Sequence, residues 1–537
     1  MTNAFFGRRG MAVAPHSLAA ESAINILREG GNALEATVSA AATIAVVYPH
    51  MNAIGGDAFW VMRGPNGQPG GIDASGPSAA MASIAEYNQR RGIATAIPFR
   101  GANAALTVAG TIGGWIKALE ISKQLGGRLP VHRLLEDAIW LAEHGVPVTE
   151  SQAKNTIAKC EELREVPGFA ETFLVNDQPP AAGSLFKQPR LAQTFKQLAR
   201  RGLDDFYRGQ IARDNAADLG KLGSPLRLAD FKNFSARLVN PLEVQVASAA
   251  LRNMRPPSQG LISLLILAIM DRVLEDHPEA LDDPCGARFI HLQVEATKLA
   301  FRLRDAHLTD PAYMSQTPES FLTEASSRKL ASEINLEHAA PWGNNTEPGG
   351  TIWMGVIDQS GIAISFIQSI YHEFGSGIVL PTTGVNWQNR GCSFSLDPAH
   401  VNCLAPGKRP FHTLNAGLAE LPNGGTMVYG SMGGDGQPQT QATLFTRMQH
   451  FGLSPQQAIE LPRWLLGRTW GNRSESLKLE ARFSSEVFTR LSEMGHLVER
   501  IGPWDESVGH AGAIVRHAHG VLEGGFDPRS NGGVAAF

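Results

Sequence analysis

Apolar residues recur along this chain with two spacings, one helical and one extended. Apolar side chains at intervals of three and four predict helices at 17–28 and 33–47, and Gly30-Gly31 between them is a helix-stop signal. The apolar runs at 59–63 and 70–73 predict strands. The first part of the chain is therefore expected to contain two helices followed by two strands.

Helical spacing dominates the middle of the chain, and strand patterns return toward its end. Between Val108 and about Pro311, helices are predicted at 112–125, 131–144, 191–201, 261–274 and 287–306. Strands are predicted within 351–379, at 426–430 and within 511–524, where 517–520 has the pattern of a hairpin turn. Strands at both ends with helices between them predict two sheets enclosed by helices.

The junction Gly350-Thr351 separates two kinds of sequence. A polar segment rich in glycine and proline ends at Gly350, and Thr351 opens an apolar run that reaches a turn at 358–361. If the bond before Thr351 were cut, one residue would carry both a hydroxyl and an α-amine. That amine has a pKa of about 7.7–8.0 and can act as the base for its own side chain. Taken alone, the segment is far more typical of an ordinary strand start than of a catalytic threonine.

Other motifs along the chain favour the catalytic interpretation. They are Glu29–Ala33, Ile54–Ala58, Pro256–Gly260, Asp358-x-x-Gly361, Phe374–Val379, Gly384, Asn386, Phe394-Ser395, Lys408–Pro410 and Tyr429–Gly436. In this order and spacing they resemble the γ-glutamyltranspeptidase family, and the resemblance runs nearly from end to end.

The resemblance implies an N-terminal-nucleophile hydrolase. Its fold would be α+β, one compact four-layer αββα sandwich made from two autoprocessed subunits. The precursor would cleave itself between Gly350 and Thr351, which makes 1–350 the large subunit and 351–537 the small subunit. The segment 336–350 would then mark the cut and not a domain linker. No cofactor is implied.

The resemblance also assigns catalytic roles by position. Thr351 would be the nucleophile, and Gly433 and Gly434 would form the oxyanion hole, since consecutive glycines let two N–H groups converge on one point. Two further family threonines are replaced here by Ile352 and Ser369. The loss at Ile352 removes one supporting hydroxyl, whereas Ser369 can still donate.

Other hydrolytic or phosphate-binding chemistry fits the residues less well. Asp435-Gly436-Gln437 lacks the Lys-Ser/Thr that a phosphate loop needs. A nucleophile elbow around Ser431 is excluded because Tyr429 stands at its first glycine position. No His/Cys/Glu cluster has zinc spacing in the sequence, so no metal is expected.

The predicted substrate pocket differs from that of the transpeptidases. The segment Asp73–Pro77 lacks their carboxylate-binding arginine, and Tyr371, Arg390 and Ser393 replace the residues that hold the α-amine. His412-Thr413 replaces a Ser-Ser pair. Arg390 would repel an ammonium group, and it would bind a carboxylate through two hydrogen bonds. The alternative for Arg390 is an ordinary solvated surface charge.

A small cationic pocket resembles the oxamate amidohydrolase branch of the family, which acts in purine-ring catabolism. The leading hypothesis is a self-processing amidohydrolase that converts oxamate to oxalate and ammonia. A γ-glutamyl hydrolase or transferase and a glutaryl-type acylase remain alternatives. An unprocessed, non-enzymatic family member is a further alternative, which the presence of Thr351, Gly433 and Gly434 disfavours.

Composition narrows the range of partners and locations. A net charge of −4 and no long basic run argue against nucleic-acid binding. The longest apolar run, 261–270, is too short to span a membrane, and the N-terminus lacks a secretory signal, so a cytoplasmic protein is predicted. The expected partners are a small amide substrate and the two subunits of one precursor, with a dimer of processed heterodimers as a possibility. The four scattered cysteines, Cys160, Cys285, Cys392 and Cys403, fit reduced thiols, with a Cys392–Cys403 pair or metal contact as the alternative.

Overall fold

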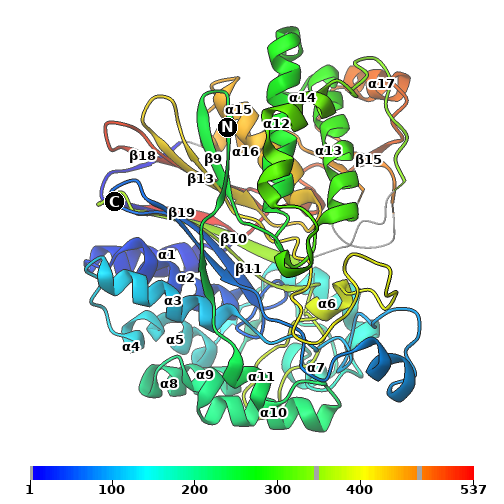
Figure 1. Cartoon of the computed structure of the whole chain (residues 1–537). Helices are drawn as coiled ribbons and strands as arrows, with labels where there is room; N and C mark the ends of the chain where they lie inside the picture. Colours follow the sequence, from blue (N-terminus) through cyan, green and yellow to red (C-terminus); the bar gives the residue numbers. More distant parts are fainter. Residues whose placement is uncertain (1–3, 344–349, 468–473) are drawn as a thin grey trace.

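Two antiparallel sheets lie face to face at the centre of the molecule, and helices cover both outer faces (Figure 1). The computed structural model describes residues 4–343, 350–467 and 474–537. Each of the two large sheets has seven strands. The expected four-layer αββα arrangement of an α+β protein is confirmed.

The strands of the first sheet come from both sides of Thr351. Their order is β19 (Gly533–Ala536), β2 (Gly10–Ala14), β10 (Gly350–Asp358), β11 (Ala363–Tyr371), β3 (Asp57–Arg63), β4 (Pro69–Ala74) and β7 (Arg237–Val239). Strands β10 and β11 therefore occupy the middle of this sheet, with earlier parts of the chain paired to each of their outer edges.

The second sheet is built in the same interleaved way. Its order is β1 (Phe5–Gly7), β18 (Leu522–Phe526), β17 (Ala511–Arg516), β13 (Thr426–Ser431), β12 (Gly417–Glu420), β9 (Ala249–Asn253) and β8 (Leu242–Val246). Four consecutive strands from the last part of the chain lie between strands from the first part.

Helices bury the outer face of each sheet. The first sheet is covered by α1 (Ser17–Arg28), α2 (Ala33–Val47) and α3 (Thr111–Gln124), and the second by α12 (Gly260–Asp276), α15 (Gly436–Gln449) and α16 (Pro455–Glu460), with α13 (Ala287–His307) packed on α12 and α15. Helix α2 begins at a capping box in which Asn32 and Glu35 satisfy each other's backbone N–H groups.

The indole of Trp353 fills the space between the two sheets. It is 2% exposed, and its Nε1 donates to Ser365 Oγ at 2.9 Å. A methyl group added at Gly430 on β13 or at Gly512 on β17 would overlap the ring. Glycine is therefore required opposite the indole, because the interior is close-packed and the backbone of the second sheet lies directly against the ring.

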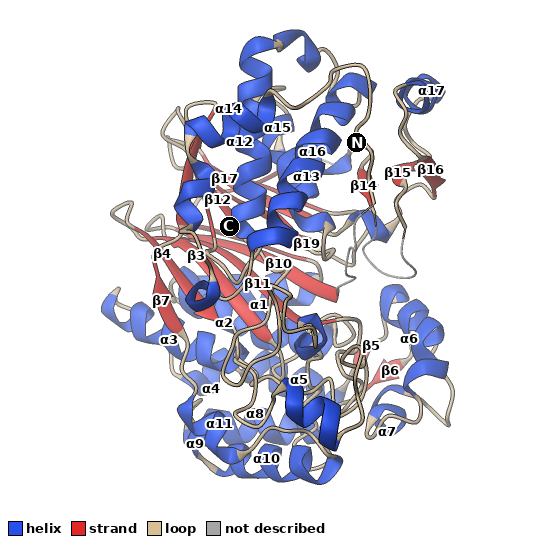
Figure 2. Cartoon of the chain, turned by 45° about the vertical axis from the view of Figure 1, so that its right-hand side comes forward, coloured by secondary structure: helices blue, strands red, loops and turns tan. Residues whose placement is uncertain are grey.

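The remaining helices extend the helical layers (Figure 2). They are α4 (Val131–Leu134), α5 (Glu136–His144), α6 (Glu150–Leu163), α7 (Phe169–Phe173), α8 (Pro189–Arg201), α9 (Asp205–Arg208), α10 (Gln210–Leu222), α11 (Leu228–Asn233), α14 (Glu324–Ala331) and α17 (Ser485–Glu493). The remaining strands are short: β5 (Val146–Pro147), β6 (Leu185–Phe186), β14 (Trp464–Leu466), β15 (Leu477–Glu480) and β16 (Val498–Ile501).

Two predicted features need correction. The single helix expected at 131–144 is divided into α4 and α5 at Leu135, where the backbone has φ of −98° and ψ of −1°. The β8–β9 hairpin was not predicted within the helical middle. Its two-residue turn is Ala247-Ser248, both with positive φ, where an Asn-Gly signal is usual.

The structure also bears on the cysteines and on membrane spans. None of the four cysteines, all of which lie in the described ranges, forms a disulfide. Among the described residues, no helix is both long and apolar enough to cross a bilayer.

Candidate active site

Thr351 lies near the start of β10, in the middle of the first sheet. The pairing of β10 with β11 shifts register between Gly350 and Ile352, so a β-bulge falls at Thr351. Bulges redirect side chains and are common beside active sites. Thr351 is 1% exposed while it is still joined to Gly350.

Ser369 Oγ on β11 contacts both sides of the Gly350–Thr351 peptide bond. It donates to the carbonyl oxygen of Gly350 at 2.5 Å and accepts from Thr351 Oγ1 at 3.3 Å. The backbone N–H of Tyr371 donates to Ser369 Oγ at 2.8 Å and fixes the position of this hydroxyl. One hydroxyl therefore polarises the carbonyl that Thr351 would attack and also binds the attacking group.

A chain of buried amides connects Thr351 to helix α15. Gln437 Nε2 lies 3.5 Å from Thr351 Oγ1, and Gln437 Oε1 accepts from the backbone N–H of Asn415 at 3.1 Å. Gln437 stands in the first turn of α15, so this chain places the N-terminal end of α15 beside Thr351.

The glycine loop between β13 and α15 has a backbone that other residues rarely adopt. Gly433 has φ of 122° and Gly434 has φ of 52°. Gln259 Nε2 donates to the carbonyl oxygens of Gly434 at 2.9 Å and Thr413 at 2.6 Å. These hydrogen bonds hold the loop against the wall of the predicted substrate pocket.

Asp435, which follows the two glycines, is anchored from the large half of the chain. Its carboxylate forms a buried ion pair with Arg304 Nη1 at 2.8 Å. Asp435 therefore anchors this loop to the large half of the chain. It stands at the start of α15, where a carboxylate also interacts favourably with the helix dipole.

Arg390 is 0% exposed, so its interpretation as a solvated surface charge is wrong. Its guanidinium lies over the Tyr371 ring, with Cζ 3.8 Å from the ring centroid. Its Nη1 lies 3.5 Å from Thr413 Oγ1. Tyr371 pairs with Gly350 across the two strands, so Arg390 is separated from the Gly350–Thr351 bond by one aromatic residue.

Asp57 places a carboxyl group beside His412. Its Oδ2 lies 3.5 Å from His412 Nε2, and its Oδ1 accepts from the N–H groups of Gly76 and Gly110 at 3.0 and 2.9 Å. Burial raises the pKa of Asp57 to about 7, although Arg390 and the N–H donors act in the opposite direction. Asp57 can therefore be neutral near neutral pH.

His412 is a neutral member of the pocket. Burial lowers its pKa well below the ordinary value, and Arg390 and Arg409 lower it further. Its ring meets Phe59 edge to face, with the centroids 5.1 Å apart. His412 can therefore offer a hydrogen bond to a ligand but contributes no positive charge.

Ser393 has a different environment from the other predicted pocket residues. Its hydroxyl donates to the carbonyl oxygen of Arg390 at 2.9 Å and also lies 3.3 Å from the carbonyl oxygen of Phe411. Both acceptors are backbone groups of the pocket wall. Ser393 therefore secures the turn that carries Arg390.

Four residues of the site had been given no role from the sequence: Asp57, Gln259, Asn415 and Gln437. Asp57 and Gln259 lie in two of the glycine motifs, so their motifs marked the region without indicating what the side chains do. Asn415 and Gln437 are isolated amides, and only the three-dimensional contacts reveal them.

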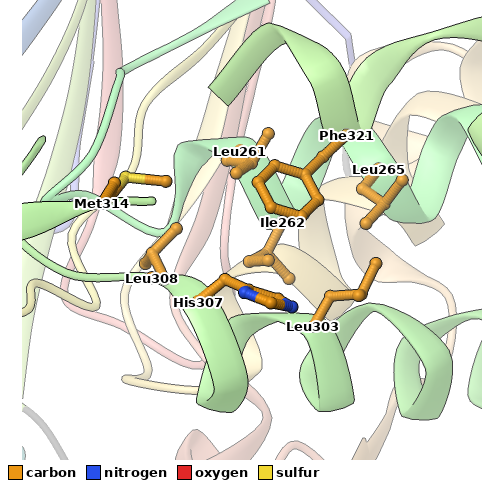
Figure 3. A pocket seen from close by; sticks show the side chains of 8 residues that line it. All are labelled: Leu261, Ile262, Leu265, Leu303, His307, Leu308, Met314 and Phe321. Carbon is orange, nitrogen blue, oxygen red and sulfur yellow. The ribbon is translucent and has the colours of Figure 1, made fainter. Parts of the chain in front are cut away.

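A separate apolar pocket lies between the N-terminal end of α12 and the C-terminal end of α13 (Figure 3). Leu265, Leu303 and Phe321 line it, and His307 is its one titratable lining residue. This lining lacks the combination of nucleophile, amide groups and cation that surrounds Thr351. This apolar pocket is therefore a different kind of site from the one around Thr351.

Several known proteins are similar to this chain over nearly its whole length. The chain is 56% identical over 529 residues to the oxamate amidohydrolase proenzyme of Klebsiella pneumoniae subsp. pneumoniae, covering 98% of each chain. It is 38% identical to the glutathione hydrolase-like YwrD proenzyme of Bacillus subtilis, covering 99% of each. The crystal structure of cephalosporin acylase from Bacillus halodurans matches with a TM-score of 0.89 and 31% identity, over 100% of this chain and 97% of that one.

The family assignment covers nearly the whole chain. The family model described as Gamma-glutamyltranspeptidase matches residues 19–537, which include Thr351, the glycine loop and every residue of the pocket described above. The chain belongs to the gamma-glutamyltranspeptidase family.

Proposed function

We propose that this protein is a self-processing amidohydrolase that hydrolyses oxamate to oxalate and ammonia, with Thr351 as its N-terminal nucleophile. The proposed precursor is cut between Gly350 and Thr351, which makes 1–350 the large subunit and 351–537 the small subunit. Two arguments support it, one for the cut and one for the substrate.

The contact of Ser369 with the Gly350 carbonyl carries the proposal. In the cut, Thr351 Oγ1 attacks the Gly350 carbonyl carbon while Ser369 stabilises the developing charge on its oxygen. The C–N bond breaks, the nitrogen becomes the α-amine of Thr351, and Gly350 is left as an ester on the threonine. Water then opens the ester to give the Gly350 carboxylate and the hydroxyl of Thr351.

Turnover repeats the same chemistry on an external amide. The α-amine of Thr351 takes the hydroxyl proton, and Oγ1 attacks the amide carbonyl of oxamate. Ammonia leaves, the oxalyl group remains as an ester on Thr351, and water releases oxalate. We assign Gly433 and Gly434 as donors to the oxyanion, since their loop is held beside the Thr351–Gln437 contact.

The buried group of Arg390, Tyr371, His412 and Thr413 favours a substrate with a carboxylate next to the amide. Arg390 is stacked on Tyr371 and presents a planar guanidinium, which suits two-point binding of a carboxylate. When Asp57 is protonated, it no longer offsets the charge of Arg390 or repels an anionic substrate. Thr413 and the neutral His412 provide further hydrogen-bonding groups, and the relative named for oxamate shares 56% of its residues with this chain.

An ammonia-release assay with oxamate, glutamine and glutathione tests the substrate. We expect turnover of oxamate at least about tenfold faster in kcat/KM than either γ-glutamyl compound, and none with Thr351→Ala. Faster turnover of glutathione would overturn the oxamate assignment and favour the γ-glutamyl alternative. Mass spectrometry of the same samples should find a fragment that begins at Thr351, and an uncut chain with full activity would overturn the processing mechanism.

The cytoplasmic location and the dimer of processed heterodimers stay predictions within this proposal. Fractionation of cells and the mass of the native enzyme in solution test them separately.

A further inference from the structure

Three potential metal ligands from distant parts of the chain meet among the helices that cover the second sheet. His291 and Glu295 lie about one turn apart on α13, and His496 follows α17. One ligand atom from each lies within 4.8 Å of the other two, and all three residues are buried. Two imidazoles and a carboxylate are a common set of protein ligands for Zn²⁺.

The hydrogen bonds of His291 point one lone pair into the cluster. Its Nε2 lies 2.8 Å from the carbonyl oxygen of Asn335, and a carbonyl can only accept, so Nε2 carries the hydrogen. In the neutral ring Nδ1 then holds the lone pair, and it lies 2.8 Å from His496 Nε2. Metal-binding histidines typically have this arrangement, in which one nitrogen faces the ion and the other donates to a backbone carbonyl.

Glu295 is oriented by its neighbours in a similar way. Its Oε2 accepts from the backbone N–H of Ala340 at 3.0 Å, and its Oε1 accepts from Lys298 Nζ at 2.7 Å. Lys298 Nζ also donates to the carbonyl oxygen of Ala340 at 2.7 Å. Lys298 therefore supplies the positive charge that would compete with a metal ion. A pocket lined by Glu295 and Lys298 adjoins the cluster and gives access to it.

We propose that His291, Glu295 and His496 bind a divalent transition-metal ion, best matched by Zn²⁺, with water from the adjoining pocket as the fourth ligand. Tetrahedral Zn²⁺ with Zn–N bonds of about 2.0–2.1 Å sets its two nitrogens about 3.3 Å apart, so the two rings separate by about half an ångström. His496 carries its ring hydrogen on Nδ1 in the bound form, so no proton is lost. Lys298 releases Glu295 and keeps its hydrogen bond to Ala340.

The site joins parts of the chain that lie on both sides of Thr351. His291 and Glu295 also hold Asn335 and Ala340 on the segment that runs toward Gly350, whereas His496 comes from the region after the junction. Bound metal would therefore clamp the end of the large half to the small half. The sequence gives little sign of the site, because His496 is 205 residues from His291.

Metal binding by the processed enzyme tests the proposal without an activity assay. After dialysis against EDTA, calorimetric titration with Zn²⁺ should show one site, and Co²⁺ should produce the visible absorption of a tetrahedral complex. His291→Gln and Glu295→Gln should each weaken Zn²⁺ binding by more than about 100-fold, since changes to outer partners alone cost about 10–100-fold. Lys298→Gln should strengthen binding, because it removes the competing ammonium.

His338→Gln is the matched control. His338 is an exposed histidine on the segment that contains Asn335 and Ala340, and it lies outside the ligand set. It should leave Zn²⁺ binding unchanged. Absence of the Co²⁺ absorption in the wild-type enzyme would overturn the proposal, and this measurement needs no variant. Unchanged Zn²⁺ affinity in a folded His291→Gln variant, checked by circular dichroism, would do the same.

Discussion

At the scale of single residues, one hydroxyl connects the two partners of the self-cleavage step. Ser369 Oγ contacts both the Gly350 carbonyl and the Thr351 hydroxyl. Ser369→Ala should slow conversion of the precursor into two fragments by about 100- to 1,000-fold, because one donor to a developing oxyanion contributes about 2.7–4 kcal/mol. A time course on denaturing gels measures the rate.

Ser365→Ala provides the control for that experiment. Ser365 is buried on the same strand, but its hydroxyl binds the Trp353 indole instead of the junction. Its cleavage rate should stay within a few-fold of wild type. Equal rates in the two variants would remove Ser369 from the cleavage mechanism.

The raised pKa of Asp57 predicts that substrate binding depends on pH. Below pH 7 the carboxyl of Asp57 is protonated, whereas above pH 7 its carboxylate offsets part of the charge of Arg390 and repels the anionic substrate. KM for oxamate should therefore rise with pH, by about tenfold for each unit well above 7, because only the protonated fraction binds. Steady-state kinetics from pH 6 to 9 measure the effect.

Asp57→Asn should remove that rise in KM and leave the low-pH value within a few-fold. Asparagine keeps an oxygen for the N–H groups of Gly76 and Gly110, so the local fold is preserved. A variant with the same KM profile as wild type would assign the pH dependence to another group, such as the α-amine of Thr351.

Residue roles could be predicted from the sequence only where a motif carried them. Thr351 and the two glycines were located by the junction and the loop motif. The burial of Arg390 could not be predicted, because it depends on Tyr371 and Thr413, which come from separate segments. For the same reason the sequence did not reveal the role of Gln437, which contacts Thr351 across 86 residues of sequence.

At the scale of elements, the loop between β13 and α15 depends on its backbone conformation. Gly433 has φ of 122°, a region that is unfavourable for residues with a Cβ. Gly433→Ala should shift the loop and lower kcat by about 100- to 1,000-fold if one oxyanion donor is lost. The control is Gly407→Ala, at another positive-φ glycine where an added Cβ meets no atom within 4 Å. Near-wild-type kcat in Gly433→Ala would exclude this loop from the oxyanion site.

Elements with strong local signals were predicted with near-correct ends. Helices α1 and α2 match the predicted ranges because the glycines between them and the Asn32 cap are local features. Helix α15 offered no such signal. Thirteen of its fourteen residues are buried, including Gln437, Gln439 and Gln441, so it lacks an exposed polar face that would reveal its period.

At the scale of the whole molecule, the two proposed subunits share both sheets. Strands from 351–537 lie between strands from 1–350 in each sheet. The processed enzyme should therefore stay associated in native gels but refold poorly after complete denaturation, with a yield that depends on protein concentration. The uncut Thr351→Ala precursor should refold with a yield independent of concentration at low concentration, because its two halves meet within one chain. Recovered tertiary structure, followed by near-ultraviolet circular dichroism, measures both yields.

Equal refolding of the cut and uncut forms would show that the halves fold as separate units, contrary to the interleaved sheets. The prediction needs no substrate, so it can be tested independently of the oxamate assignment.

Trp353 lies two residues after Thr351, and its indole rests on Gly430, three residues before Gly433. The aromatic ring therefore contributes to the gap between β10, which carries Thr351, and β13, which leads to the loop that we propose as the oxyanion site. The indole acts as a spacer between the strands, and it fits only because the residues opposite it are glycines. Replacing Trp353 with a residue that has a smaller ring would change the distance between Thr351 and the Gly433-Gly434 loop, although the substitution does not touch the substrate.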